Sequence, residues 1–223
     1  MNKQLLNRLV KKFSKNLSRA YDFALHSSTT LVKNCNSILH IISFDLPPSG
    51  LYCNIAVLPI YFPINVISYD VGNRLNHFKV NLSGNWCNGD TEDELLRDLD
   101  EIQKLIEINV LPWFNEVSDP VTFIEMLESE LSPETQSVTM CPPHLDYLYI
   151  GFSYLFLKEY EQAKTALKKA LQRSMEYAPN LLNVNPWCLI RPNLKLLEDK
   201  QTEIIEANLQ AYVKQTCINL KLE

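Results

Sequence analysis

Two apolar runs separated by a Pro-Pro-Ser-Gly break constrain the fold of this chain more than any other feature of its sequence. The runs, Ser37–Leu46 and Leu51–Tyr61, are rich in Ile, Val, Phe and Tyr, which favour β-strands. The break, Pro47-Pro48-Ser49-Gly50, has the composition of a turn. Two strand-like runs around such a turn predict an antiparallel hairpin.

Further strands are expected on both sides of this hairpin. Residues 20–26 and 30–36 precede it and residues 74–80 follow it. Together they predict an antiparallel β-meander of four to five strands. The second run of the hairpin alternates only in part between polar and apolar residues, which is consistent with a sheet covered on both faces. Pro59 cannot donate a backbone hydrogen bond, so it marks a strand end, an edge or a bulge.

Residues 2–17 predict an amphipathic helix before the sheet. Its apolar residues recur at spacings of three and four and form one stripe, with bases on the remaining face: Leu5, Leu6, Leu9, Val10, Phe13 and Leu17. A basic amphipathic helix can lie on an anionic membrane. We favour packing of the stripe on the sheet, because a sheet with an open face follows immediately.

After Asp90 the pattern becomes helical. Thr91 with Glu94 has the spacing of a capping box, and a wide apolar stripe follows. Pro112 is expected to end or bend this helix, and Ser118-Asp119-Pro120 to start a second, short one. We therefore predict an α+β domain over residues 1–130.

Residues 131–143 are expected to connect this domain to a helical subdomain over residues 144–223, docked on it or continuous with it. The subdomain contains residues at the spacing of a tetratricopeptide helix pair: Tyr147, Ile150, Gly151, Tyr154, Tyr160, Ala163, Leu167 and Ala170. Residues 144–174 therefore resemble one tetratricopeptide unit, although Met175 occupies the position of its closing proline. The resemblance implies a helical hairpin, with Gly151 and Ala163 at the close crossing. A last helix over about 195–217 could stack on it.

The charge distribution suggests which partners the chain could bind. The net charge of −5 argues against a general nucleic-acid binder, which needs a broad basic surface. Residues 1–20 carry six bases and no acid, whereas residues 91–130 carry twelve acids and two bases. The acids are interpreted either as a solvated helix face or as a surface that attracts a basic protein. The strongest candidates for such an interaction are Glu92, Asp93, Asp98 and Glu101.

Trp113 and Phe114 are the aromatic candidates. They are expected to fill the join between sheet and helices; if exposed, they would instead anchor a partner.

No catalytic, cofactor-binding or metal-binding residues are assigned from the sequence. The four histidines (His26, His40, His77 and His144) lack the spacing of a helical metal site, and no cysteine has a local nucleophile signature. Five glycines spread over 223 residues do not supply a phosphate-binding loop. No cofactor is expected.

The six cysteines and the hydropathy pattern bear on location. The cysteines contain no C-x-x-C pair and are expected to be free thiols in a reducing cytoplasm. No stretch approaches the length of a membrane span, and residues 1–20 lack the continuous apolar segment of a secretion signal.

The block Ser37–Pro63, the stretch Gly72–Phe78 and the acidic helix ending in Leu111-Pro-Trp-Phe114 together resemble an uncharacterised bacterial family over residues 1–130. That family is known only as a domain of unknown function, and some families of this kind occur among toxin-immunity proteins. The resemblance implies a bacterial origin and supplies no catalytic residues.

Three functions remain open at this stage. The leading hypothesis is a non-enzymatic protein-binding protein, of which an immunity-type inhibitor of a basic partner is one form. The second is a small-molecule binder or hydrolase with a cleft between sheet and helices, lined by His40, His77 or His144 and a carboxylate. The third is peripheral membrane attachment through residues 2–17. The oligomeric state is open.

Overall fold

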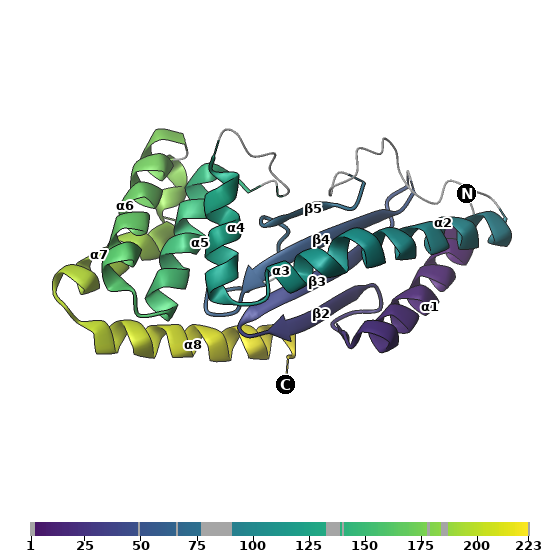
Figure 1. Cartoon of the computed structure of the whole chain (residues 1–223), viewed down its shortest axis with the longest axis horizontal. Coiled ribbons are helices and arrows are strands. Elements are labelled where there is room, and N and C mark those ends of the chain that lie inside the picture. Colours follow the sequence, from purple (N-terminus) through teal and green to yellow (C-terminus); the bar gives the residue numbers. More distant parts are fainter. Residues whose placement is uncertain are drawn as a thin grey trace.

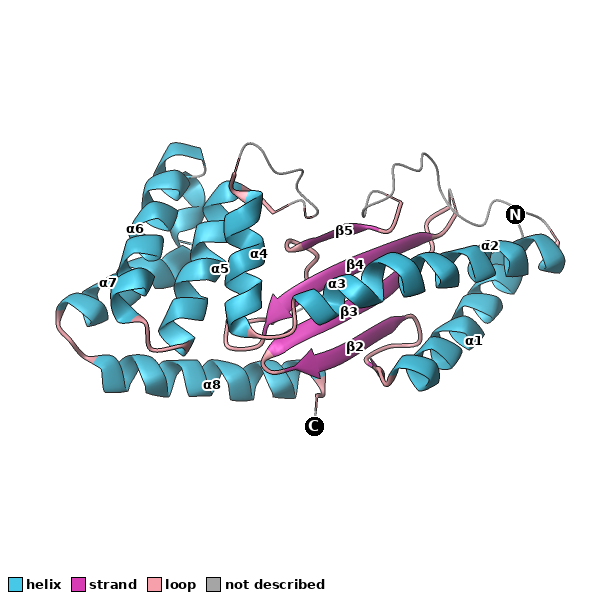
Figure 2. Cartoon of the chain, viewed as in Figure 1, coloured by secondary structure: helices cyan, strands magenta, loops and turns pink. Residues whose placement is uncertain are grey.

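The computed structural model describes residues 3–48, 50–65, 67–76, 91–132, 139, 141–177, 179–183 and 187–222. An N-terminal helix and a five-stranded antiparallel sheet are followed by a C-terminal part built from helices (Figures 1 and 2). The predicted α+β class and the meander are confirmed.

The five strands follow one another in the sheet in chain order: β1 (Ala24–Leu25), β2 (Thr30–Cys35), β3 (Ile38–Asp45), β4 (Tyr52–Pro59) and β5 (Gly72–Arg74). Strands β3 and β4 form the predicted hairpin, with Asp45 paired to Tyr52 next to the turn. Pro59 is the last residue of β4, as one of the sequence alternatives had it. β5 begins two residues before the predicted 74–80, and residues 77–80 lie outside the described part of the chain.

Both faces of the sheet are covered. Every residue of β3 except Asp45 is buried. On one face, the Phe44 ring meets Phe13 of the N-terminal helix edge-on, with 5.6 Å between ring centroids. On the same face His40 stacks on Phe114, with 4.4 Å between centroids. The partly polar pattern of the hairpin thus reflects a sheet buried on two sides.

The N-terminal helix, α1 (Lys3–Tyr21), places the predicted apolar stripe in the core. Five of the six predicted residues are fully buried and Leu5 packs partly buried beside them. Because this face contacts the protein's own interior, it is not available to a lipid surface in this fold, and the membrane hypothesis loses its basis. Among the described residues, none of the helices offers an apolar stretch long enough to span a bilayer.

The acidic helix α2 (Glu92–Leu105) begins at the predicted capping box, in which Thr91 and Glu94 exchange side-chain and backbone hydrogen bonds. It continues through a π-helical turn (Ile106–Val110) into α3 (Leu111–Glu116). Pro112 lies in the first turn of α3, where its missing N–H costs little, so the proline is accommodated next to the π turn rather than by ending the helical path. α4 (Pro120–Glu130) begins with the predicted cap at Asp119.

The C-terminal part contains α5 (Pro143–Phe156), α6 (Tyr160–Tyr177), two 3₁₀ turns (Pro179–Asn183 and Trp187–Leu189), α7 (Ile190–Glu198) and α8 (Thr202–Leu220). The predicted helical hairpin is α5 with α6. A Cβ added to Gly151 would lie only 2.7 Å from Leu167 Cδ2, which confirms the close crossing. The single helix predicted over 195–217 is wrong in one respect, because the chain breaks between α7 and α8, where Lys200 has a φ of 55°.

Helix α8 joins the helical part to the sheet, along the lower edge of the molecule in Figure 1. Thr216 Oγ1 donates to the Phe62 carbonyl at 3.1 Å, and Leu220 O lies 3.0 Å from His26 Nδ1. A second join is the Tyr61 hydroxyl, 2.7 Å from Ser153 Oγ of α5. The buried apolar residues of both parts form one continuous cluster.

Candidate functional site

The four acidic candidates lie on α2, which crosses one face of the sheet (Figure 1). Glu92, Asp93 and Glu101 are exposed and Asp98 is half-buried, while Leu95, Leu99 and Ile102 of the same helix face the core. The helix therefore has one apolar and one acidic face. This is the arrangement that both sequence interpretations of the acids require, so the choice between them remains a prediction.

Part of the acidic face is neutralised within the chain. Arg8 of α1 donates to Glu92 Oε2 at 3.1 Å. Further along both helices, the Tyr21 hydroxyl of α1 donates to Glu107. The first contact joins the early part of α1 to the start of α2, and the second joins the end of α1 to the π-helical turn after α2. The basic helix therefore runs alongside the acidic one in the same direction. The exposed acids of α2 left for a partner include Asp93, Asp100 and Glu101.

The aromatic candidates are core residues. Trp113 and Phe114 are each 2% exposed. Phe114 also packs on His40, whose Nε2 donates to the Val117 carbonyl at 2.8 Å. Burial lowers the pKa of His40 to about 4, so the ring is neutral at pH 7. These side chains fill the join between sheet and helices, as the core interpretation expected, and offer no surface anchor.

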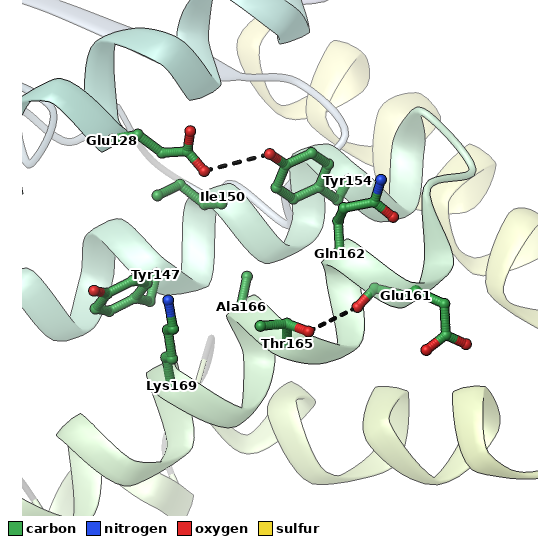
Figure 3. A pocket seen from close by; sticks show the side chains of 9 residues that line it. All are labelled: Glu128, Tyr147, Ile150, Tyr154, Glu161, Gln162, Thr165, Ala166 and Lys169. Atoms are coloured by element: carbon green, nitrogen blue, oxygen red, sulfur yellow. Dashed lines mark hydrogen bonds between the residues drawn. The ribbon is translucent and has the colours of Figure 1, made fainter.

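A groove lies between α4, α5 and α6, on the outer side of the helical hairpin (Figure 3). It has a volume of about 310 Å³. Buried Ile150 and Ala166 line it together with half-buried Tyr147 and Tyr154. The exposed residues that line it are mostly polar: Glu128, Glu161, Gln162, Thr165 and Lys169.

The groove's side chains are held by weak, exposed contacts. The Tyr154 hydroxyl donates to Glu128 Oε1 at 3.3 Å, joining α5 to α4. Lys169 Nζ lies 5.3 Å from the centre of the Tyr147 ring (Figure 3). Exposed pairs of this kind contribute little free energy to stability. A bound polypeptide could therefore replace them with only a small loss of stabilising free energy. Aromatic walls with an acidic rim are a surface that suits a polypeptide segment.

A second pocket, of about 600 Å³, lies beside the start of α5. Titratable residues line it: Glu130, Cys141, His144, Asp146, Tyr147, Arg173 and Tyr177. This brings His144 together with two carboxylates, as the small-molecule hypothesis required, but the pocket is lined by α4, α5, α6 and the connector and not by the sheet, where that hypothesis placed its cleft. His40 lies elsewhere, in the core under α3, and His77 lies outside the described residues.

Asp146 is the most unusual residue of this second pocket. It is only 4% exposed, yet its Oδ1 atom has no hydrogen-bond partner. Burial, with a smaller contribution from Glu130, raises the pKa of the carboxyl to about 7, against a lowering by the hydrogen bond from the Cys141 thiol. Buried polar atoms are nearly always paired, so an unpaired oxygen on a residue that lines a cavity points to a ligand.

The same electrostatics argue against a cysteine nucleophile here. Burial and the nearby carboxylates, Asp146 first, raise the pKa of the Cys141 thiol. Nucleophilic cysteines need the opposite, a thiolate stabilised by positive charge. Burial also lowers the pKa of His144, so that histidine supplies no such charge at pH 7. In the described part of the chain, no group of His, Cys, Asp and Glu has the geometry to hold a metal ion.

A third cavity, of about 670 Å³, lies between the end of α5, helix α8 and the β2–β3 turn. Its walls are mainly apolar, including Leu155, Phe156, Leu209 and Val213. The Lys158–Glu206 ion pair, with 2.7 Å between Nζ and Oε2, lies at its rim. None of the buried side-chain atoms that lack a hydrogen-bond partner among the described residues belongs to its lining, so this cavity gives no comparable indication of a ligand.

Sequence reasoning found part of these sites. Tyr147 and Tyr154 were singled out as members of the helix-pair pattern, and His144 as a histidine beside Cys141. Asp146 and Glu128 were missed. Only the fold shows that Asp146 is buried beside a cavity and that Glu128 of α4 bonds to Tyr154 of α5 at the groove. The acid in the first turn of α5 was the one available signal for Asp146.

Comparisons with protein-family models, with curated proteins and with solved structures gave no match for this chain. The resemblances of residues 1–130 to a bacterial family and of residues 144–174 to a tetratricopeptide unit therefore remain predictions.

Proposed function

We propose that this chain is a non-enzymatic protein-binding protein whose groove between α4, α5 and α6 holds a basic polypeptide segment. The observation that carries the proposal is the groove itself, in which half-buried Tyr154 lies beside Glu128 and half-buried Tyr147 lies beside Lys169, with Glu161 also among the lining residues (Figure 3). Tyrosines supply large contact areas at low entropic cost, and the acids favour a basic segment.

The acidic face of α2 supports the same partner class. Its exposed acids, Asp93 and Glu101 among them, attract a basic protein at long range and raise its association rate. In its narrower form the proposal is an immunity-type inhibitor of a basic bacterial protein, and a gene for such a protein beside the gene for this chain would support it.

A cytoplasmic location belongs to the proposal. Cys35, Cys53, Cys141, Cys188 and Cys217, the cysteines within the described residues, are free thiols. A reducing compartment preserves free thiols, whereas secreted domains tend to pair them.

The test is capture of a partner by wild-type protein and by two variants of α6. Thr165→Arg adds bulk and positive charge in the groove, whereas Met175→Arg adds the same side chain at an exposed position outside it. Wild type and Met175→Arg are expected to retain the same basic protein from a native extract, and Thr165→Arg to lose it. Retention should weaken as salt is raised.

Equal retention by Thr165→Arg would contradict the groove as the binding site. Capture that is specific but insensitive to salt would contradict the basic character of the partner. Replacing Asp93 and Glu101 by Asn and Gln is expected to slow association about tenfold or less, with little effect on dissociation.

A further inference from the structure

We propose that the pocket beside the start of α5 binds a small organic cation, an alkylammonium or alkylguanidinium group, with Asp146 as its counter-ion. This site is separate from the groove, although both are lined by Tyr147. The proposal does not depend on the chain having a protein partner.

The first argument is the unsatisfied carboxylate. Asp146 is only 4% exposed, and its Oδ1 atom has no hydrogen-bond partner among the described residues. The Cys141 thiol bonds to this carboxyl, but one oxygen stays unpaired, and a buried polar atom without a partner is costly, so folded proteins rarely retain one without use. An N–H donor entering the pocket would supply the missing bond and the opposite charge together.

The second argument is the sign of the surrounding charge. Glu130 lies on the pocket wall, and its Oε1 accepts the Thr139 backbone N–H at 3.0 Å. Asp70 adds its negative charge near Cys141. His144, from the first turn of α5, is neutral at pH 7 because burial lowers its pKa. The interior of the pocket is therefore negative and would repel an anion.

Arg173 is the positive residue among those lining the pocket, and it is held at its outer side. Its Nη1 atom lies 3.7 Å from Glu176 Oε2, and its guanidinium lies 5.9 Å from the centre of the Tyr177 ring. Its side chain is 43% exposed, so water screens its charge. The charge of Arg173 is thus shared with Glu176 and reduced by water.

The third argument is size and wall chemistry. A volume of about 600 Å³ falls in the range of small-molecule sites and far exceeds the space of a metal ion. Leu131 and Pro142 line the pocket with apolar surface, and Tyr147 and Tyr177 add aromatic rings. Such walls suit an alkyl chain with a cationic head, which aromatic faces also attract.

The experiment measures binding of butylammonium and butylguanidinium to the full chain by calorimetry, with 1-butanol as the neutral compound of equal length. Both cations are expected to bind at least about tenfold more tightly than butanol, as a charged hydrogen bond contributes that much. Equal affinity for butanol, or no binding of either cation at roughly 10 mM, overturns the proposal.

Two variants locate the site. Asp146→Asn keeps the shape of the side chain and removes its charge, and is expected to weaken both cations about tenfold or more. Asp199→Asn changes an exposed acid at the end of α7 and is the matched control, expected to bind as wild type does. Unchanged binding by Asp146→Asn, checked to be folded by circular dichroism, overturns the assignment.

Two sources could supply such a cation: a free amine or a basic side chain of another polypeptide. Blocked tripeptides Gly-Lys-Gly and Gly-Arg-Gly distinguish them. Binding of the free cations without the tripeptides assigns the pocket to a small molecule. Tripeptide binding at least as tight, and equally lost in Asp146→Asn, assigns it to a side chain; both outcomes support the proposal.

Discussion

The sheet half and the helical half of this protein treat their buried polar groups differently. Around the sheet, the buried polar side chains find partners within the protein: His40 donates to Val117, Ser43 bonds to Thr30, and Asn54 donates to Asp45. Among the described residues of the helical half, three buried side-chain atoms lack a partner: Asp146 Oδ1, Ser174 Oγ and Trp187 Nε1.

These three atoms come from segments at one end of the helical hairpin. Asp146 is in the first turn of α5, Ser174 is near the end of α6, and Trp187 packs near His144, with 6.1 Å between ring centroids. Where every buried polar group has a hydrogen-bond partner in the protein, no such group is left for a ligand. Where a buried group beside a cavity lacks a partner, a ligand can supply the missing hydrogen bond. The difference places the search for function in the helical half.

The largest expected effect tests how far the two halves fold together. Phe44→Ala removes a 2% exposed ring from the sheet core and should lower the free energy of unfolding by about 3–5 kcal/mol. Urea denaturation measures this loss. The control Ile218→Ala, at a 52% exposed side chain, should stay within about 0.5 kcal/mol of wild type.

Hydrogen exchange in the Phe44→Ala variant then sharpens the comparison. Protection from exchange is expected to fall in α5 and α8 as well as in the strands. The reason is that Tyr61 bonds to Ser153 of α5 and Phe62 accepts a bond from Thr216 of α8. Full protection of α5 and α8 would show that the halves unfold separately.

The second prediction is that the halves respond to pH in opposite directions. In the sheet half, burial lowers the pKa of His40 from 6.5 to about 4. The unfolded chain therefore binds a proton that the folded chain refuses, and stability is lost as pH falls from about 6.5 to about 4. In the helical half, burial raises the pKa of Asp146 from 3.8 to about 7. The folded chain therefore holds a proton on Asp146 that the unfolded chain releases. The resulting contribution to stability is fully present below pH 3.8 and is lost as pH rises through about 7.

Two substitutions separate these effects, each on the order of 3 kcal/mol from the size of the shifts. Urea midpoints measured across this pH range should show that His40→Phe lessens the fall in stability on the acid side. Asp146→Asn should lessen the fall between about pH 4 and 7. If Asp146→Asn leaves the profile unchanged, the carboxylate is solvated or paired and the contrast between the halves is wrong.

A third prediction asks whether the helical half is as tightly packed as the sheet. Gly151→Ala places a Cβ 2.7 Å from Leu167 Cδ2 and 2.8 Å from its Cγ, inside a buried crossing. Overpacking should outweigh the gain in helix propensity and lower stability by about 1 kcal/mol. A gain in melting temperature would instead mean that the crossing yields and that the helical half is loosely packed.

The smallest expected effect concerns the surface pair between α1 and α2. Arg8 and Glu92 have side chains that are 67% and 51% exposed. A double-mutant cycle with Arg8→Met and Glu92→Gln should give a coupling of about 0.5 kcal/mol or less, and less still at high salt. A coupling above roughly 1 kcal/mol would show that the basic helix is an electrostatic partner of the acidic one.

Local sequence signals accounted for most of the fold. Strands β3 and β4 lie within two residues of their predicted limits, because Pro47-Pro48 interrupts two runs of strand-forming residues. Thr91 caps α2 as its spacing to Glu94 predicted, and α4 starts where Ser118-Asp119-Pro120 predicted a helix start, because such signals need only neighbouring residues. The break at Lys200 was missed, because a lysine with positive φ carries none of the glycine signal that usually marks such a turn.

The candidate sites depended on long-range packing, and the sequence could not show it. Asp146 becomes unusual mainly through its burial in the fold, where it also meets Cys141 of the connector and the charge of Glu130 of α4. The sequence could not show the partner of His40, because the Val117 carbonyl is 77 residues away. The exposed acids of α2 were visible from composition, but their pairing with α1 was not.

The contacts of α8 constrain the order in which parts of this chain can fold. Residues 216 and 220 bond to residues 62 and 26, so these contacts close loops of more than 150 residues. Long-range contacts of this kind slow folding, since a large loss of chain entropy precedes them. During synthesis, these contacts can therefore form only after α8 has emerged, and that interval is when chaperones or premature association would act on the unfinished chain.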